Sequence, residues 1–100
     1  MFVRLVFGKV QTDKIEEFRR WYKNEDVPAV KNQKGLRMLL LLESVDVLGE
    51  AVSLSIWDSK EDAEAFEKRG PYKELVKKAI PLLTEEPVRK SYDVTVVHQA

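Results

Sequence analysis

Leucine dominates the segment from residue 36 to residue 42, and this segment gives the clearest structural signal in the chain. Apolar residues occupy its even positions and also the odd positions Leu39 and Leu41. Seven residues are too few to cross a membrane, so the run predicts a β-strand. Because alternate residues of a strand point to opposite faces, both faces of this strand are predicted to be buried. Helices of the same chain can cover only one face of a small sheet. A second copy of the chain would cover the other face, so the pattern predicts a homodimer.

The hydrophobic periodicity of the rest of the chain predicts a single α+β domain over residues 1–100. The predicted strands cover residues 2–10, about 35–45, 50–57 and about 88–98. The predicted helices cover about 12–24, followed at Pro28 by a break or by a fresh start that adds one turn with Ala29 and Val30, and about 59–69, with a renewed helix after Gly70. This βαββαβ order is typical of a ferredoxin-like fold, a four-stranded antiparallel sheet with both helices on one face. Two such sheets are expected to meet as a dimeric α/β barrel.

The strand at 50–57 predicts how the uncovered face of the sheet is built. Its bulky row is expected to pack under the helices and consists of Val52, Leu54 and Ile56. Its other row is small and polar before it ends in a large ring, and it consists of Ala51, Ser53, Ser55 and Trp57. Small hydroxyl residues beside a large ring are typical of a ligand cavity rather than of a packed interface. The second row therefore predicts a cavity on the uncovered face, inside the dimer.

Four residues are candidates for substrate binding on that face: Trp57, Arg4, Ser53 and Ser55. Trp57 would stack on a flat aromatic ligand, or it is a core or interface aromatic whose N–H is satisfied. Arg4 would anchor an anionic group, or it pairs across the sheet with Asp93 or with a second subunit. The two serines would hydrogen-bond a ligand, or their small size lets two sheets approach closely.

Two further residues, His98 and Tyr72, each allow a functional and a structural interpretation. His98 has the reference pKa of a general base at neutral pH, but it lies near the C-terminus, where chains fray. Tyr72 follows the Gly70 break and would close a cavity mouth or pack between helices.

Composition narrows the classes of function. Lys and Arg total 17 and Asp and Glu total 17, so the net charge is zero, which argues against nucleic acid as the main partner. The chain has no Cys and one His, which argues against a disulfide framework, a thiolate nucleophile and a multi-His zinc site. The opening residues lack the apolar run of a secretion signal, so a cytoplasmic location without membrane contact is expected.

One stretch of the chain resembles a known family. It begins with Ile56-Trp57-Asp58-Ser59 at the end of a strand, continues into a helix that contains Phe66, and reaches Tyr72 after a break. With the βαββαβ order, this pattern resembles the antibiotic biosynthesis monooxygenase (ABM) family of dimeric α/β-barrel proteins, over nearly the whole chain. The resemblance implies a homodimer and either the cofactor-independent oxygenation of quinol-like aromatics or the oxidative breakdown of haem.

Departures from the family pattern separate these activities. Haem-degrading relatives carry an axial His where this chain has Glu67, and an Asn in the first strand, where this chain has none. Quinol-oxidising relatives carry an Asn where this chain has Ser53, which cannot reproduce the geometry of an amide. The resemblance therefore implies a cofactor-independent monooxygenase of a small aromatic or quinol-like substrate, with Trp57 carried over and no cofactor. The alternatives are a dimer that binds a small apolar ligand without turnover and a barrel packed solid.

Overall fold

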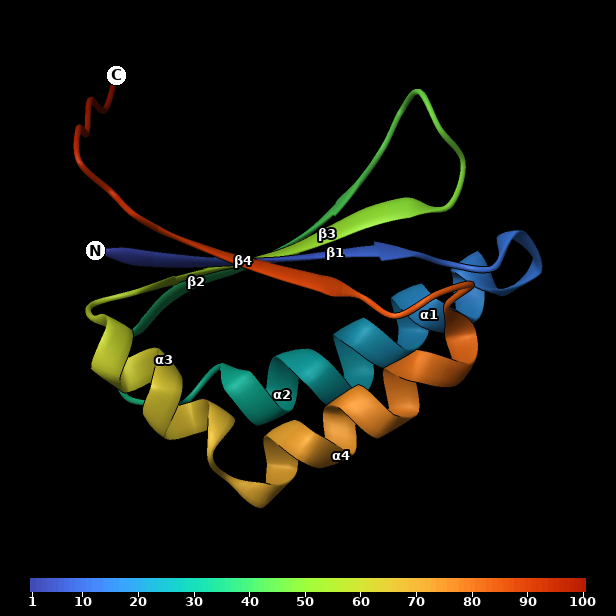
Figure 1. The fold of residues 1–100 in the computed structure, drawn as a ribbon, viewed down its shortest axis with the longest axis horizontal. Coiled ribbons are helices and arrows are strands. Elements are labelled where there is room, and N and C mark those ends of the chain that lie inside the picture. Colours follow the sequence, from blue (N-terminus) through green and yellow to red (C-terminus); the bar gives the residue numbers. More distant parts are fainter.

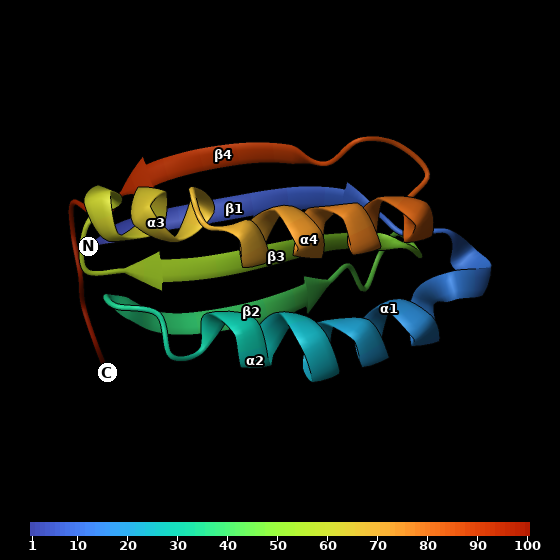
Figure 2. The ribbon, with the colours of Figure 1, turned by 90° about the horizontal axis from the view of Figure 1, so that it is seen from below.

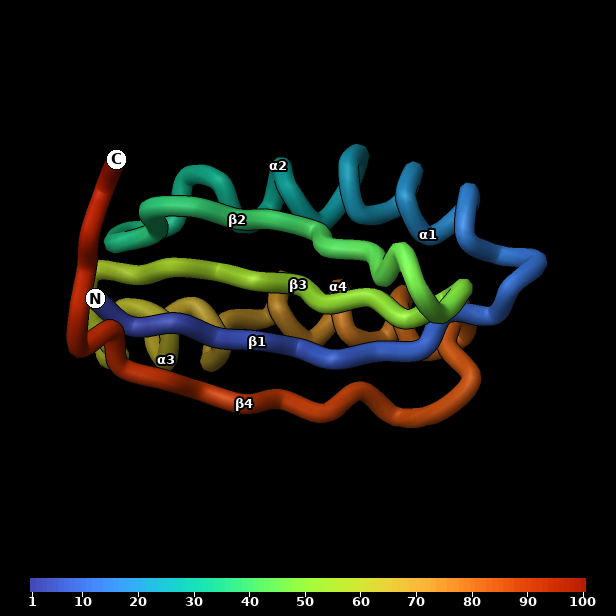
Figure 3. Tube along the Cα trace, turned by 90° about the horizontal axis from the view of Figure 1, so that it is seen from above, coloured from blue at the N-terminus to red at the C-terminus, as the bar shows by residue number.

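The computed structural model describes residues 1–100 as one antiparallel sheet with every helix on the same side of it (Figure 1). The strands are β1 (Phe2–Lys9), β2 (Leu36–Glu43), β3 (Glu50–Trp57) and β4 (Val88–Asp93). They lie in the order β2-β3-β1-β4, with all neighbours antiparallel. Figure 2 shows the sheet behind the helices, and Figure 3 shows its opposite face with no helix in front of it. The predicted ferredoxin-like α+β fold is confirmed.

The first helical arm connects β1 to β2 and includes the additional turn at Ala29 and Val30. It consists of η1 (Thr12–Lys14), α1 (Ile15–Trp21), the π-helical turn η2 (Tyr22–Asp26) and α2 (Val27–Val30). Of the two predictions for Pro28, a break or a fresh start, the fresh start is confirmed, because Pro28 lies in the first turn of α2, which follows η2 without an interruption. A proline inside a regular α-helix clashes with the carbonyl four residues before it. Here that carbonyl belongs to the wider turn η2, in which the Val27 N–H donates to the Tyr22 carbonyl five residues back.

The second helical arm connects β3 to β4 and follows the prediction closely. It consists of α3 (Lys60–Glu67), α4 (Gly70–Ala79) and the short η3 (Ile80–Leu82). The Ser59 hydroxyl caps α3 by accepting a hydrogen bond from the Asp62 N–H at 3.2 Å. None of the helices is long and apolar enough to span a membrane.

β4 is shorter than predicted, since it ends at Asp93 rather than near residue 98. It is an edge strand that pairs only with β1, and the register places Asp93 opposite Phe2, where β1 begins. The strand therefore stops where its partner stops, although the residues that follow have high β-propensity.

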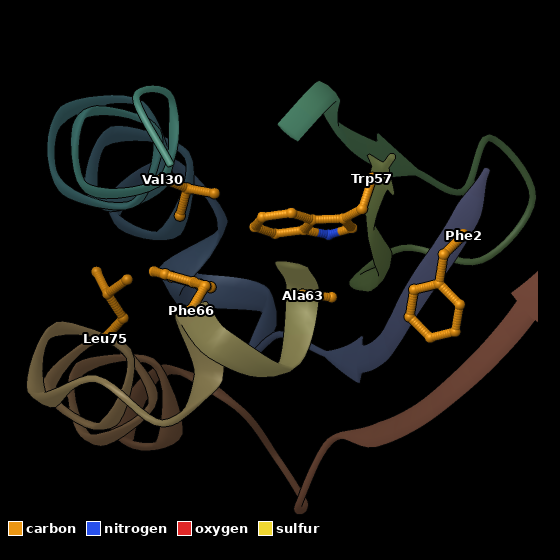
Figure 4. Close-up of a cluster of buried hydrophobic side chains, with 6 residues drawn as sticks. All are labelled: Phe2, Val30, Trp57, Ala63, Phe66 and Leu75. Atoms are coloured by element: carbon orange, nitrogen blue, oxygen red, sulfur yellow. The ribbon is translucent and has the colours of Figure 1, made fainter. Parts of the chain in front are cut away.

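The core between sheet and helices consists of two adjoining clusters. One holds Phe2, Val30, Trp57, Ala63, Phe66 and Leu75 (Figure 4). The other holds Val10, Phe18, Tyr22, Ala51 and Leu82. In the first cluster the Trp57 ring is stacked on the Phe66 ring, with 5.8 Å between their centroids.

The structure reverses the predicted orientation of β3. Trp57 is only 2% exposed and packs against helix α3, so the row with Ser53 and Ser55 faces the helices and the bulky row faces away. The reason is the size of the side chains on the helices, which bring large rings to the sheet. Small residues in β3 leave space for these rings, whereas a bulky row would collide with them.

The uncovered face of the sheet is apolar and has no partner within the chain. Across its centre, Leu40 of β2, Leu54 of β3 and Leu5 of β1 are successive register partners. Its large exposed side chains are Phe7, Met38, Leu40, Leu42, Val88 and Tyr92. The predicted cavity therefore does not lie on this face.

Candidate functional site

A cavity of about 150 Å³ lies between the sheet and the helices, and apolar side chains form most of its wall. The predicted site residues Trp57, Arg4, Ser53 and Ser55 all line it. The structure thus brings the four residues together, but within one chain and on the helix-covered side of the sheet. An apolar cavity with a few polar side chains is the usual form of a small-molecule site.

Both serines are held by aromatic residues of the fold. The Ser53 hydroxyl lies 2.8 Å from the Tyr22 hydroxyl, which also donates to the Leu40 carbonyl at 3.3 Å. Ser55 accepts a hydrogen bond from the Trp57 Nε1–H at 2.9 Å. The Trp57 N–H is therefore satisfied within β3, and the Ser55 hydroxyl keeps its own proton free for donation.

Arg4 is buried at the wall of the cavity, with only 8% of its surface exposed. Its Nε and Nη2 donate to the Glu67 carboxylate at 3.0 and 2.7 Å, and its Nη1 donates to Ser91 of β4. Arg89 donates to the same carboxylate at 2.8 Å. The predicted alternative of a pair with Asp93 is wrong, because α3 reaches over the sheet and supplies the counter-ion. Glu67, which stands where haem-degrading relatives carry a His, is engaged by two arginines.

Asp26 is the site residue that sequence reasoning missed. It lies at the end of the π-helical turn η2 and lines the cavity. No hydrogen bond or ion pair lowers its pKa, and burial alone raises that pKa to about 6. Burial also raises the pKa of Tyr22, an effect that the hydrogen bond from Ser53 opposes and the nearby charge of Asp26 increases.

The wide turn η2 aims Asp26 at the cavity. In a regular α-helix of 3.6 residues per turn, residues four apart are rotated by about 40° around the axis. Phe18, Tyr22, Asp26 and Val30 would then drift steadily around the arm, yet all four line the cavity. A turn with more residues corrects this drift, and such turns occur often at functional sites. The spacing of four between these residues indicated a shared face of one helix. The expected break or fresh start at Pro28, however, separated Val30 from the other three.

Trp21, the last residue of α1, also lines the cavity. Its Nε1–H is the only buried side-chain nitrogen or oxygen without a hydrogen-bond partner. An unsatisfied buried donor is costly and calls for an acceptor.

The two remaining sequence candidates have different outcomes. Tyr72 of α4 lines the cavity and meets the Phe66 ring edge-on, with 5.6 Å between centroids, so it packs between helices. His98 is exposed in the segment after β4 and does not line the cavity. No group of three or more His, Asp or Glu side chains is placed to hold a metal ion.

Comparison of the sequence with models of known protein families gave a match. Residues 1–78 match the family model described as antibiotic biosynthesis monooxygenase. A search of curated proteins gave no significant match.

Solved structures of this family share the fold. A protein from Nitrosomonas europaea named for the family superposes with a TM-score of 0.83 at 21% identity, covering 96% of this chain and 100% of its own. One from Deinococcus radiodurans, also named for the family, has a TM-score of 0.87 at 12% identity, covering 100% and 98%. SnoaB from Streptomyces nogalater, described as a cofactor-independent oxygenase and solved as its N63A mutant, has a TM-score of 0.83 at 12% identity, covering 96% and 94%.

Proposed function

Because this chain belongs to the antibiotic biosynthesis monooxygenase family, we propose that it is a cofactor-independent monooxygenase of a small aromatic or quinol-like substrate. The observation that carries the proposal is the mainly apolar cavity of about 150 Å³ under the helices. A cavity of this size lined by apolar side chains binds a benzene ring in other proteins. SnoaB, a structural neighbour, is described as a cofactor-independent oxygenase, and this description supports oxygenation without a cofactor.

The reaction would use the substrate itself as the reductant. In the overall balance, a substrate carbon loses two hydrogens, one oxygen atom of dioxygen enters as a carbonyl, and the other oxygen leaves as water. Trp57 would provide a flat wall for the ring of the substrate, and Ser55 would orient a polar group with its free hydroxyl proton. Arg4, at the wall of the cavity, would stabilise negative charge on the substrate while it stays paired with Glu67.

The active form would be a homodimer joined through the uncovered face of the sheet. That face carries large exposed apolar side chains, among which Met38 is 49% and Leu40 is 40% exposed. Contiguous exposed apolar surface usually marks an interaction site, and a second copy of the same sheet is a self-complementary cover.

A non-catalytic ligand-binding protein is the second candidate function. Three of the predicted polar residues already have partners in the fold: Ser53 bonds to Tyr22, Ser55 to Trp57, and Arg4 to Glu67. Because these three groups are already satisfied, they favour holding a ligand over transforming it.

Oxygen uptake tests the proposal. The protein would be treated with a chelator and supplied with hydroquinones and hydroxylated two-ring aromatics in an oxygen electrode. We expect enzyme-dependent uptake of one dioxygen per product, without added flavin or metal, and a loss of uptake in Ser53→Leu, which fills the cavity. If ligands bind but consume no oxygen, the binding function is correct. Native mass spectrometry of the same sample reports the dimer and any bound ligand.

A further inference from the structure

We propose that Asp26 is a catalytic residue, the acceptor of a proton from a hydroxyl group on an aromatic ligand in the cavity. The inference rests on the proposed function and deepens it, because it specifies a hydroxyaromatic substrate and the residue that activates it. Three features of the cavity support it: the unpaired carboxyl group of Asp26, the unpaired N–H of Trp21, and the helical arm in which the turn η2 directly follows Trp21 and ends at Asp26.

Two carboxylates line the cavity, and only one is free to act as a base. Glu67 accepts hydrogen bonds from Arg4 at 2.7 and 3.0 Å and from Arg89 at 2.8 Å, so its lone pairs are engaged. Asp26 has no such partner, and burial makes its carboxylate more basic than an exposed one. A partly buried carboxylate without a counter-ion costs stability, which is typical of functional sites.

Trp21 supplies the complementary group. Its Nε1–H is buried without an acceptor, and the ring lines the same cavity as Asp26. The donor is closed off in this structure, so a ligand oxygen would satisfy it only after the ring shifts toward the cavity. A hydroxyaromatic can therefore meet both needs, since it donates its hydroxyl proton to Asp26 and offers an oxygen acceptor to Trp21. A plain hydrocarbon ring would leave both groups unpaired.

The proton transfer is balanced within the site. The hydroxyl O–H bond breaks, its electron pair stays on the ligand oxygen, and the proton forms a bond to a carboxylate oxygen of Asp26. The phenolate spreads its charge into the ring and is a better electron donor than the phenol. Dioxygen, the oxidant of the proposed function, is the acceptor of those electrons.

Asp26, whose raised pKa lies near neutral, shares the cavity with four other titratable groups. They are Tyr22 of the same turn, Tyr72 of α4, Arg4 of β1 and Glu67 of α3. The pKa of Tyr22 is raised well above neutral, and Arg4 and Glu67 form an ion pair. Beside the turn, Glu25 pairs with Lys78 of α4 at the exposed surface.

Binding of phenol and of anisole, its methyl ether, tests the proposal without requiring turnover. Affinities would be measured by NMR titration of the protein between pH 5 and pH 7.5. If phenol binds the ionised carboxylate, its affinity should rise about tenfold over this range, following the ionised fraction of a group of pKa about 6. Anisole has no proton to donate, so its affinity should stay level or fall.

Asp26→Asn should abolish the rise for phenol, and the exposed Asp13→Asn should retain it. The proposal is overturned if phenol shows no rise in the natural protein, or if Asp26→Asn keeps the rise.

Oxygen uptake separates this proposal from the proposed function. If uptake occurs and Asp26→Asn keeps the same kcat/KM profile from pH 5 to 8, the proton acceptor is another group and the oxygenase function stands. If phenol binding depends on Asp26 while no hydroxyaromatic consumes oxygen, proton acceptance by Asp26 stands and the oxygenase function fails.

Discussion

Replacing Asp26 by Asn should stabilise the protein at neutral pH, although it removes the proposed base. In the native state burial holds the pKa of Asp26 near 6, against an ordinary value of 3.8. The native state therefore binds this proton more tightly than the unfolded chain does. The contribution of Asp26 to stability is therefore highest when its carboxyl is protonated, below about pH 4, and is lost as the pH rises through about 6.

The size of the effect follows from the difference between the two pKa values. Keeping Asp26 ionised in the cavity costs about 3 kcal/mol at pH 8, because one pKa unit corresponds to roughly 1.4 kcal/mol. The cost falls below about 1 kcal/mol near pH 4, where the native carboxyl is protonated. An Asn amide is uncharged at every pH and avoids the pH-dependent part of this cost.

Urea denaturation of both proteins between pH 4 and pH 8, at one protein concentration, measures the effect. We expect the midpoint of Asp26→Asn to exceed that of the natural protein by about 1–3 M urea at pH 8, with the gap closing toward pH 4. Asp13→Asn, at an exposed position of the same arm, should show no such trend. A gap that does not change with pH, or a variant less stable at pH 8 than at pH 4 relative to the natural protein, would refute the reasoning.

Three further substitutions test separate parts of the structure. Leu40→Glu places a charge on the uncovered sheet face, so native mass spectrometry should find a folded monomer, and a persistent dimer would contradict the proposed interface. Glu67→Ala leaves Arg4 buried without its counter-ion and should cost roughly 3 kcal/mol in urea denaturation; a cost under about 1 kcal/mol would mean that the pair is effectively solvated. Ser59→Ala removes the cap of α3 and should cost about 1 kcal/mol without changing phenol affinity, whereas a change in affinity would show that α3 shapes the cavity more than its contacts indicate.

Much of the fold was predictable because local patterns dictate it. The strand at 50–57 has the same bounds in prediction and structure, and the helix renewed at Gly70 begins there as expected. The four predicted site residues line one cavity for a simple reason. Ser53, Ser55 and Trp57 share a row of β3, and register places Arg4 opposite Ser55. Alternation along a strand is a property of the sequence alone.

The position of the cavity was not predictable from that alternation. Both rows of β3 are suited to burial, so the strand by itself does not show which row faces the helices. The choice depends on the rings of Phe18, Tyr22 and Phe66, which come from other parts of the chain and need small neighbours in the sheet. The roles of Asp26 and Trp21 were hidden for a related reason. Local rules predict a break or a fresh start at Pro28, whereas the wider turn η2 before it, which keeps the arm helical, has no local sequence signal.

The sequence by itself thus determined the elements, their order, and the presence of an apolar row on both faces of the sheet, because these depend on periodicity within short segments. Only the tertiary structure decided which face holds the cavity and which carboxylate stays unpaired. Those outcomes depend on the fit between side chains far apart in the chain, such as Glu67 with Arg4 and Tyr22 with Ser53. Asp26 remains without a partner because no cation of the fold reaches it.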